Sequence, residues 1–296
     1  MLLAQMTNYE PFGITQELDT EPIFTLKVEQ NGLLSMEQRE VYPHVFTDNS
    51  EDDMPRIEVY RSLEKEWLIR ISQIATSPIC CELVCDADFT RGMLHIDADC
   101  QDVRFCIDNG LMLMYAFRTA PLMTLEMHAA VVVKPSLEDA SLQFRGRSQS
   151  ELQAKGYLFL GHSGTGKSTH ARQWLAAFED AWLLNDDNPI LRVMPNGEVR
   201  VYGSPWSGKT ACYHNDYVPV GGIVKLSQAP HNKIQTISLP EAYAYMLSSA
   251  SGLKMDPYMA DYMYESIKHV ITHVKCYHME CLPNTEAAEV ALRGMV

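Results

Sequence analysis

The sequence predicts an α/β protein in which a β-rich α+β domain over residues 1–120 precedes a domain of alternating strands and helices over residues 121–296. Three observations support this prediction. Of the 296 residues, 46% are apolar and 21% are charged, which is enough apolar material for two ordinary cores or one large one. Before about residue 100 the apolar segments mostly have the pattern of strands. From residue 157 onward, strand-like and helix-like segments follow one another.

The charge balance limits the classes of partner. The chain has 24 basic and 38 acidic residues, so its formal net charge is −14. A surface with this charge repels a polyanion, and nucleic acid is therefore not expected as a partner. The first 25 residues lack a basic segment before a long apolar run, and no stretch has the roughly 18 consecutive apolar residues of a membrane span. We therefore expect a cytoplasmic protein without a membrane partner.

The eight cysteines do not suggest a disulfide framework, because the chain is too long for one. Cys80, Cys81 and Cys85 lie in PICCELVC, where a buried strand explains them better than a metal site, since no second pair of ligands follows at zinc-finger spacing. The segment KCYHMEC (residues 275–281) has three ligand-type side chains, but two of them share one face of a predicted strand. A structural role is favoured for both groups.

In the N-terminal domain, β-branched and alternating apolar residues predict strands, which are separated by breakers. They are EPIFTLKVEQ (residues 21–30), RIEVYRSLEKEWLIRIS (56–72), PICCELVC (78–85) and GMLHIDA (92–98). The acidic tract at residues 48–53 predicts a loop. The segment CIDNGLMLMYAF (106–117) is apolar around much of its circumference and predicts a buried helix that Pro121 ends.

In the C-terminal domain, MHAAVVV (127–133) predicts a strand, and the polar segment 134–156 predicts an exposed hairpin or loop. YLFL (157–160), AWLL (181–184) and GGIVKL (221–226) predict further strands. Helices are predicted from residue 169 and at residues 239–250 and 257–274, and a strand and a short helix are predicted at the end. Because strands and helices alternate, the strands of this layer are expected to be parallel.

Residues 161–168, GHSGTGKS, match the phosphate-loop pattern of Gly, four residues, Gly, Lys and Ser or Thr. The predicted strand before the loop and the predicted helix after it are the context that this motif requires. Backbone N–H groups and the helix N-terminus would surround phosphate oxygens, Lys167 would contact the β and γ phosphates, and Ser168 would bind Mg²⁺. The predicted nucleotide-binding residues are Gly161, Ser163, Gly164, Thr165, Gly166, Lys167, Ser168 and Thr169.

A second segment, GSPWSGKT (203–210), matches the same pattern. Pro205 removes a backbone donor, and no helical pattern follows, so we do not expect this segment to hold a nucleotide. Two alternatives stay open for it. It is either a loop that closes over a substrate with Trp206 and Lys209, or an ordinary turn held by a packed tryptophan.

Two adjacent carboxylates follow the predicted strand 181–184. If this strand lies beside strand 157–160, Asp186 and Asp187 emerge at the carboxyl edge of the sheet, next to the loop. There they would hold Mg²⁺, or one of them would have a raised pKa near a reacting hydroxyl. The alternative is a turn before Pro189, for which Asn and Asp are also suited. Asn232, Lys233 and Gln235 lack the aspartate of a guanine-reading motif, so an adenine nucleotide is expected.

These residues resemble a known family. GYLFLGHSGTGKSTHARQWL, followed by LLNDDNPILRV and preceded by MHAAVVV, is similar to the catalytic core of HPr kinase/phosphorylase and its serine-kinase relatives, whose nucleotide fold is shared with phosphoenolpyruvate carboxykinase. The similarity covers roughly residues 122–226 and leaves the N-terminal 120 residues unmatched.

The resemblance implies that Lys167 and Ser168 act on phosphate and Mg²⁺, that Asp187 is the general base and that Asp186 binds or supports the metal. It also implies that His128 lies beside the phosphates, whereas the residues alone favour a core histidine. The family has a further metal-binding glutamate in a strand before a glycine, and the comparable stretch here, VRVYGSP, has none. Relatives of this kind are oligomers, so a homo-oligomer is an expectation as well.

The sequence therefore predicts an ATP- and Mg²⁺-dependent kinase that transfers the γ-phosphoryl group to a hydroxyl acceptor, either a protein serine or a small metabolite. Two alternatives remain. One is a regulatory protein that binds ATP without turnover, and the other is a lyase similar to phosphoenolpyruvate carboxykinase.

Overall fold

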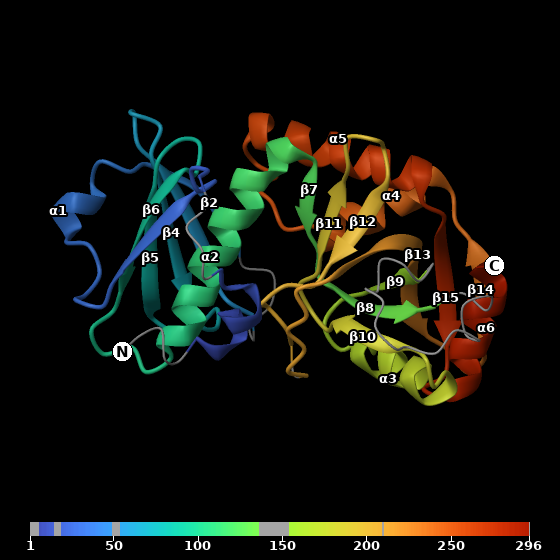
Figure 1. The fold of residues 1–296 in the computed structure, drawn as a ribbon. Helices are drawn as coiled ribbons and strands as arrows, with labels where there is room; N and C mark the ends of the chain where they lie inside the picture. The colour runs from blue at the N-terminus through green and yellow to red at the C-terminus, as the bar shows by residue number, and fades with distance from the viewer. Residues whose placement is uncertain (1–5, 15–18, 49–53, 136–153, 209, 296) are drawn as a thin grey trace. The chain divides into compact units, whose positions relative to one another are not determined.

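The computed structural model describes residues 6–14, 19–48, 54–135, 154–208 and 210–295 (Figure 1). These residues form two compact units. The first unit contains residues 6, 19–48, 54–119 and 253–257, and the second contains the rest of the described chain. The predicted boundary after residue 120 is close to the main division between the units. Residues 7–14 belong to the second unit and residues 253–257 to the first, and the sequence gives no signal for either assignment.

The first unit is a six-stranded sheet with one long helix, as far as the chain is described. The strand order is β1-β6-β5-β4-β3-β2, in which β1 and β6 are parallel and the other pairs are antiparallel. The long helix α2 packs on the part of the sheet made by β1, β6 and β5. The elements are β1 (Thr25–Glu29), α1 (Met36–Arg39), β2 (His44–Asp48), β3 (Ile57–Arg61), β4 (Trp67–Ser72), β5 (Ile79–Cys85), β6 (Arg91–Ile96) and α2 (Val103–Thr119).

Three of the predicted strands and the predicted helix of this unit lie where expected, and the fourth predicted strand, 56–72, is two strands. β3 and β4 form an antiparallel hairpin, and Lys65 has a φ of 69° in the turn between them. Strand β2 was not predicted, because its residues are mostly exposed and lack a clear alternation. Of the predicted loop 48–53, only Asp48 belongs to the described residues, and it ends β2.

The second unit is built on a nine-stranded mixed sheet. Its main path is β10-β8-β9-β13-β12-β11-β7, and β15 pairs with β13 and with β14. The strands of the described residues are β7 (Thr124–Glu126), β8 (Ala129–Lys134), β9 (Lys155–Leu160), β10 (Trp182–Asn185), β11 (Ile190–Val193), β12 (Val199–Tyr202), β13 (Tyr217–Gln228), β14 (Lys233–Thr236) and β15 (Cys276–Cys281). Short 3₁₀ segments lie at Thr7–Phe12 and Ala120–Leu122.

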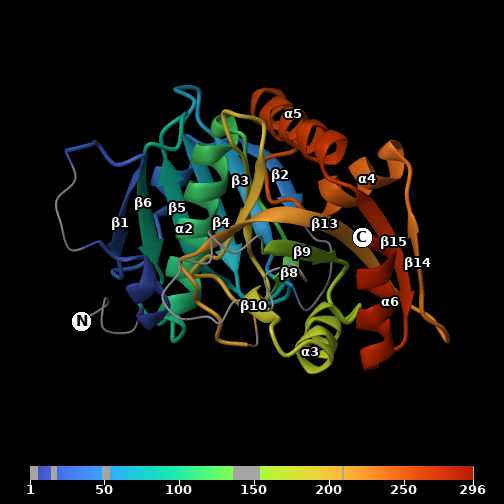
Figure 2. The same cartoon turned by 45° about the vertical axis from the view of Figure 1, so that its right-hand side comes forward.

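Helices cover both faces of this sheet (Figure 2). On one face, Trp174 and Ala171 pack with Phe159 and Val132 in a buried cluster that also includes Ala288. On the other face, helix residues pack against the alternate residues of the same strands. The helices are α3 (Lys167–Ala177) and α6 (Thr285–Met295) on the first face, and α4 (Leu239–Ser249) and α5 (Pro257–His273) on the second. The sheet is buried on both sides, which explains why its strands read as continuous apolar runs.

The expectation of an all-parallel layer is wrong. β9, β13 and β15 are parallel, but β8 lies antiparallel between β9 and β10. The predicted strands 157–160 and 181–184 are therefore not neighbours. The consequence for the carboxylates is small, because β9 and β10 both run antiparallel to β8 and so end at the same edge of the sheet. The predicted hairpin or loop 134–156 lies mostly outside the described residues.

No helix of the described residues combines the length and the apolar character needed to cross a bilayer.

Candidate functional site

The glycine-rich loop lies between β9 and α3, as the sequence predicts. Gly164 has a φ of 76° and Gly166, which precedes the first residue of α3, has a φ of 107°. L-amino acids with a side chain rarely adopt these angles, so glycine is required at both positions. A Cβ on Gly161 would lie 2.9 Å from the side chain of Thr165. Ser163 is exposed, and Ser168 and Thr169 lie half-buried in the first turn of α3. The N-terminus of α3 therefore has the backbone conformation of an anion-binding loop.

Lys167 is buried and points back along the loop. Its Nζ donates a 2.9 Å hydrogen bond to the carbonyl oxygen of Gly161. The same Nζ lies 3.0 Å from Nε2 of His128, which comes from the segment between β7 and β8. The side chain is only 8% exposed, and burial lowers the pKa of Lys167, although Asp187 and Asp186 oppose this shift. The ammonium group thus lies at the mouth of the loop with partners that a phosphate can replace.

His128 is held through its backbone and the backbones of its neighbours. Its own N–H donates to the carbonyl of Ser249 at 2.7 Å, and the N–H of Ala129 donates to the carbonyl of Asp187 at 2.8 Å. The N–H of Met127 donates to the carbonyl of Pro189 at 3.0 Å. These bonds connect the start of β8 to the end of α4 and to the turn that carries Asp187. The position of the imidazole is therefore defined by two other segments of the second unit.

The side chains of Lys167, His128 and Asp187 form one group. Nε2 of His128 lies 3.4 Å from Oδ1 of Asp187 in addition to its contact with Lys167. When neutral, Nε2 accepts a hydrogen bond from Lys167, and when protonated it forms an ion pair with Asp187. Burial lowers the pKa of His128, and the charge of Lys167 lowers it further. The neutral imidazole is therefore favoured at pH 7.

Asp187 has a raised pKa, because burial disfavours its charged form more than His128 and Lys167 favour it. Its carboxylate is still about one-third exposed, at 36%. A carboxylate with a raised pKa, within reach of solvent and next to a cationic group, has the properties of a general base. The general-base role of Asp187 is the one that the family resemblance implies.

The turn that carries Asp187 is fixed by Asn185, a fully buried residue that the sequence analysis did not single out. Its Oδ1 accepts from the backbone N–H of Asp187 at 2.9 Å. Its Nδ2 donates at 3.1 Å to both Oγ of Ser204 and the carbonyl oxygen of Trp206. A buried amide in NDDNP was visible in the sequence, but its partners come from a loop about twenty residues away. Asn185 links the carboxylate turn to the second glycine-rich segment.

Asp186 is 3% exposed, and its Oδ2 is buried without a hydrogen-bond partner among the described residues. Unpaired buried carboxylate oxygens are costly, and a cation compensates for them. Ser168 supplies a hydroxyl at the start of α3, at the same edge of the sheet. Oxygen donors of these two kinds are what Mg²⁺ prefers, so the predicted metal pair fits this ion chemically.

A third carboxyl, Glu126 at the end of β7, was missed by the sequence analysis. It is 2% exposed, Oε1 has no partner within the described chain, and burial with the nearby Asp187 charge raises its pKa to about 8. Glu126 is therefore protonated at neutral pH. The predicted strand began at Met127, whereas the structure has β7 ending at Glu126 and β8 starting at Ala129. An acidic residue two positions before His128 was the only available signal.

The second glycine-rich segment approaches the carboxylate turn but has no helix after it. A Cβ on Gly208 would lie 3.3 Å from Cβ of Asp187. Trp206 is 7% exposed, and its Nε1 donates to the hydroxyl of Tyr9 at 2.8 Å, so this side chain anchors the loop within the second unit. Lys209 lies outside the described residues. Trp206 has the environment of a packed tryptophan, and the backbone at Gly208 is the part of the described loop that borders Asp187.

Two cavities adjoin the first loop. One of about 540 Å³ is lined by Gly166, Thr169, His170, Gln228 and Leu282, among others. The other, of about 90 Å³, lies on the side of His128 and is lined also by His162, Lys225, Tyr245 and Ser248. The loop thus separates a large cavity from a small polar one.

His170, one of the residues that line the larger cavity, has a buried ring nitrogen that is unpaired among the described residues. Burial lowers its pKa to about 4, so the ring is neutral at pH 7. Trp174 Nε1 donates to Nε2 of His170 at 3.1 Å, and an indole is a donor only, so the ring proton lies on Nδ1. Nδ1 is buried and has no partner in the described part of the chain.

Comparisons of the chain with protein-family models and with curated proteins find no match.

Proposed function

We propose that this protein is an ATP-dependent phosphotransferase that moves the γ-phosphoryl group to a hydroxyl acceptor, with a nucleotide-binding core of the HPr kinase and phosphoenolpyruvate carboxykinase type. The observation that carries the proposal is the convergence of Lys167, His128 and Asp187 at the mouth of the loop. Nε2 of His128 lies 3.0 Å from Nζ of Lys167 and 3.4 Å from Oδ1 of Asp187. An ammonium, an imidazole and a carboxylate at a helix N-terminus are suited to phosphoryl transfer.

Under this proposal the nucleotide would bind at the first loop and in the cavity beside it. Its phosphates would contact the N–H groups of the loop and the N-terminus of α3, and the adjoining cavity of about 540 Å³ is large enough for a nucleoside. Thr169 and Gln228 offer polar side chains there, and Leu282 and Pro283 offer apolar ones. The nucleoside and the acceptor would then lie on opposite sides of the loop.

Asp186 and Ser168 would hold Mg²⁺, because Asp186 has a buried oxygen with no partner among the described residues and Ser168 has a hydroxyl in the first turn of α3. When bound, the ion supplies neutralisation of phosphate charge. Lys167 would exchange its bond to Gly161 for a bond to a phosphate oxygen, which keeps the buried ammonium paired. Asn185 keeps the turn of both aspartates in place.

In the transfer step, a hydroxyl oxygen of the acceptor forms a bond to the γ phosphorus, and the bond from that phosphorus to the β–γ bridging oxygen breaks. Asp187 takes the hydroxyl proton and later releases it to solvent. ADP keeps the electron pair of the broken bond. The neutral His128 ring stays between Lys167 and Asp187 and prevents direct pairing that would lower the basicity of the carboxylate. Catalysis of this kind depends mainly on positioning and on charge stabilisation.

The acceptor is a protein serine or a small hydroxylated metabolite. The smaller cavity, next to His128, contains Lys225 and Tyr245, and the ammonium of Lys225 lies 5.0 Å from the centre of the Tyr245 ring. A cation in this cavity favours an acceptor that carries a negative group near its hydroxyl. Phosphate acceptors without such a group are expected to react more slowly.

The experiment is transfer of label from γ-labelled ATP with Mg²⁺, with and without serine or a cell extract, using the full chain. Asp187→Asn is expected to lower transfer by about 10²–10⁴-fold while ATP binding stays within a few-fold, because it removes the base and keeps the shape. Lys167→Ala is expected to weaken both binding and transfer. Matched controls are Asp261→Asn on α5 and Lys155→Ala at the start of β9, which change exposed residues with the same charges.

Two results would contradict the proposal. Full turnover in Asp187→Asn refutes the assignment of the base. Tight ATP binding by the wild-type chain without transfer or hydrolysis refutes the phosphotransferase and favours a nucleotide-regulated binding protein. Exchange of carboxylate for phosphate on a dicarboxylate substrate would favour the lyase alternative.

A further inference from the structure

Half of the cysteines gather at one place in the first unit. Cys80 and Cys81 lie on β5, Cys106 lies on α2, and Cys100 lies between β6 and α2. The sulfurs of Cys80, Cys81 and Cys106 all lie within 4.8 Å of one another. The sulfur of Cys100 is 3.6 Å from that of Cys106. No disulfide joins them, and all four are free thiols.

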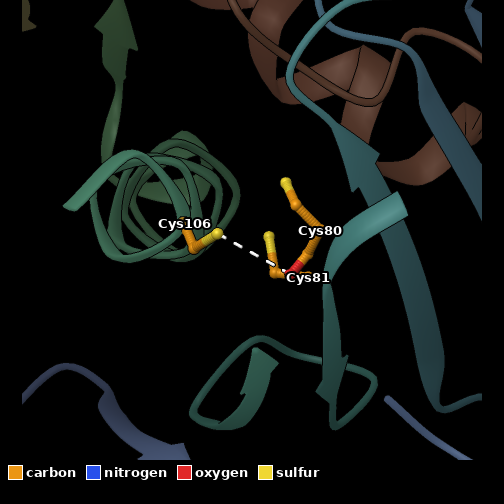
Figure 3. A group of neighbouring side chains, drawn as sticks. All are labelled: Cys80, Cys81 and Cys106. Carbon is orange, nitrogen blue, oxygen red and sulfur yellow. Dashed lines mark hydrogen bonds between the residues drawn. The ribbon is translucent and has the colours of Figure 1, made fainter. Parts of the chain in front are cut away.

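A β-bulge brings the two adjacent cysteines to one side of β5. Cys81 pairs with Ile71 and Ile79 pairs with Ser72, so Cys80 is the extra residue of the bulge. In a regular strand, neighbouring side chains point to opposite faces. Here both sulfurs are directed to the side of α2, where Cys106 faces them (Figure 3). Bulges of this kind redirect side chains and are frequent near functional sites.

Three of the four sulfurs are already grouped nearly as in a thiolate metal site. Zinc–sulfur bonds of about 2.3 Å in a tetrahedron place the sulfurs about 3.8 Å apart. The sulfurs of Cys80, Cys81 and Cys106 would approach one another by at most about 1 Å, and the contact between Cys100 and Cys106 already has nearly the required length. The sulfur of Cys100 lies outside the group of three, so binding requires it to move toward Cys80 and Cys81. Cys81 and Cys106 are fully buried, and Cys80 is 9% exposed. Such a site cannot be occupied by a hydrated hard cation, which would require oxygen ligands.

We propose that Cys80, Cys81, Cys100 and Cys106 bind one Zn²⁺ in a structural tetrathiolate site that ties β5 to α2. As the four Zn–S bonds form, four S–H bonds release their protons to solvent, so binding is stronger at higher pH. The site belongs to the first unit and does not depend on the phosphotransferase proposal. Its role is to fix the helix on the sheet.

The test uses Co²⁺ as a spectroscopic probe and Zn²⁺ as a competitor on the reduced, metal-free full chain. We expect one Co²⁺ per chain, with sulfur-to-cobalt charge-transfer absorption and the strong visible bands of tetrahedral coordination, both removed by one equivalent of Zn²⁺. Cys81→Ser and Cys106→Ser are expected to weaken Zn²⁺ binding by more than about 100-fold. Loss of a residue that only hydrogen-bonds to a metal ligand already lowers metal affinity by about 10–100-fold, and loss of a ligand itself should cost more. Cys85→Ser, which changes a buried thiol of the same strand outside the group, is the matched control and keeps the absorption.

The wild-type spectrum decides the proposal even where a variant fails to fold. The proposal is overturned if the wild-type protein with Co²⁺ lacks charge-transfer absorption. It is also overturned if the visible bands are those of octahedral coordination. Folding of the variants is checked by circular dichroism, and a folded Cys106→Ser protein with unchanged Zn²⁺ affinity also overturns it. Unchanged affinity in Cys100→Ser refutes Cys100 as the fourth ligand and with it the tetrahedral site.

Discussion

The folded protein disfavours the ionised form of Glu126, and Glu126→Gln removes this carboxyl group. The pKa of Glu126 rises from an ordinary value of 4.5 to about 8, because the group is buried and because the Asp187 charge is near. The difference of about 3.5, at about 1.36 kcal/mol for each pKa step, corresponds to roughly 5 kcal/mol between the fully protonated and fully ionised limits. Glutamine keeps the shape and cannot ionise.

The sign follows from proton binding. Between pH 4.5 and pH 8 the folded protein holds the proton of Glu126 and the unfolded chain has lost it, so stability falls as pH rises through this window. The full contribution of Glu126 to stability is present below the pKa of 4.5 that the group has in the unfolded chain. This contribution is lost as the pH rises to the folded-state pKa of about 8. From pH 6 to pH 8 the expected loss due to this residue is about 2 kcal/mol.

Urea unfolding, followed by tryptophan fluorescence and circular dichroism at pH 6 and pH 8, measures the effect. The free energy of unfolding of the wild type should fall between these pH values by about 2 kcal/mol more than that of Glu126→Gln, since other titrating groups cancel in the comparison. An exposed acidic residue, Glu265 on α5, provides the control variant Glu265→Gln. Equal pH dependence in the wild type and Glu126→Gln would refute a protonated Glu126.

Three further substitutions test the loop and the carboxylate turn. Gly166→Ala places a residue with a side chain at a φ of 107° and should lower the free energy of unfolding by about 1–2 kcal/mol. The measurement is the melting temperature, which should fall, and an unchanged melting temperature would contradict the requirement for glycine at this position. Asn185→Ala should cost about 2 kcal/mol in urea unfolding, because buried partners lose their bonds, and a change below about 0.5 kcal/mol would contradict this linking role. In a double-mutant cycle, Trp206→Phe and Tyr9→Phe should couple by about 1 kcal/mol through the 2.8 Å hydrogen bond, and additive effects would show that this bond does not stabilise the loop.

Local patterns allowed much of the second unit to be predicted from sequence. The strand, loop and helix around residues 161–168 are encoded within about twenty consecutive residues, and so their order could be read directly. Strand order could not, because pairing depends on segments far apart in the chain. The insertion of β8 between β9 and β10 joins residues 129–134 to residues 155–160 and 182–185, and no periodicity specifies such a neighbour.

The same distinction holds for the candidate site. Lys167 and Asp187 lie in motifs whose residue types fit phosphate and base chemistry, so the sequence indicates them. Glu126 and Asn185 act through burial and through partners from other segments, which composition and spacing do not show. Cys106 was assigned to a buried helix and Cys80 to a buried strand, and both assignments are confirmed, but the bulge that brings their sulfurs together has no sequence pattern of its own.

The formal charges of the site predict a dependence on divalent cation. With Glu126 protonated, Lys167 contributes one positive charge and the two aspartates contribute two negative charges, so a polyphosphate alone meets a net negative group. On the proposed function, ATP affinity should therefore fall by at least about tenfold, or ~1.4 kcal/mol, when Mg²⁺ is replaced by a chelator. Asp186→Asn removes one of these charges and the carboxylate oxygen that has no partner in the described part of the chain. It should reduce both the ATP affinity with Mg²⁺ and the loss of affinity when Mg²⁺ is removed. Calorimetric titration with and without Mg²⁺ measures both quantities. Equal ATP affinity in the two conditions, or a chelator effect in Asp186→Asn as large as in the wild type, would show that Asp186 does not hold the ion.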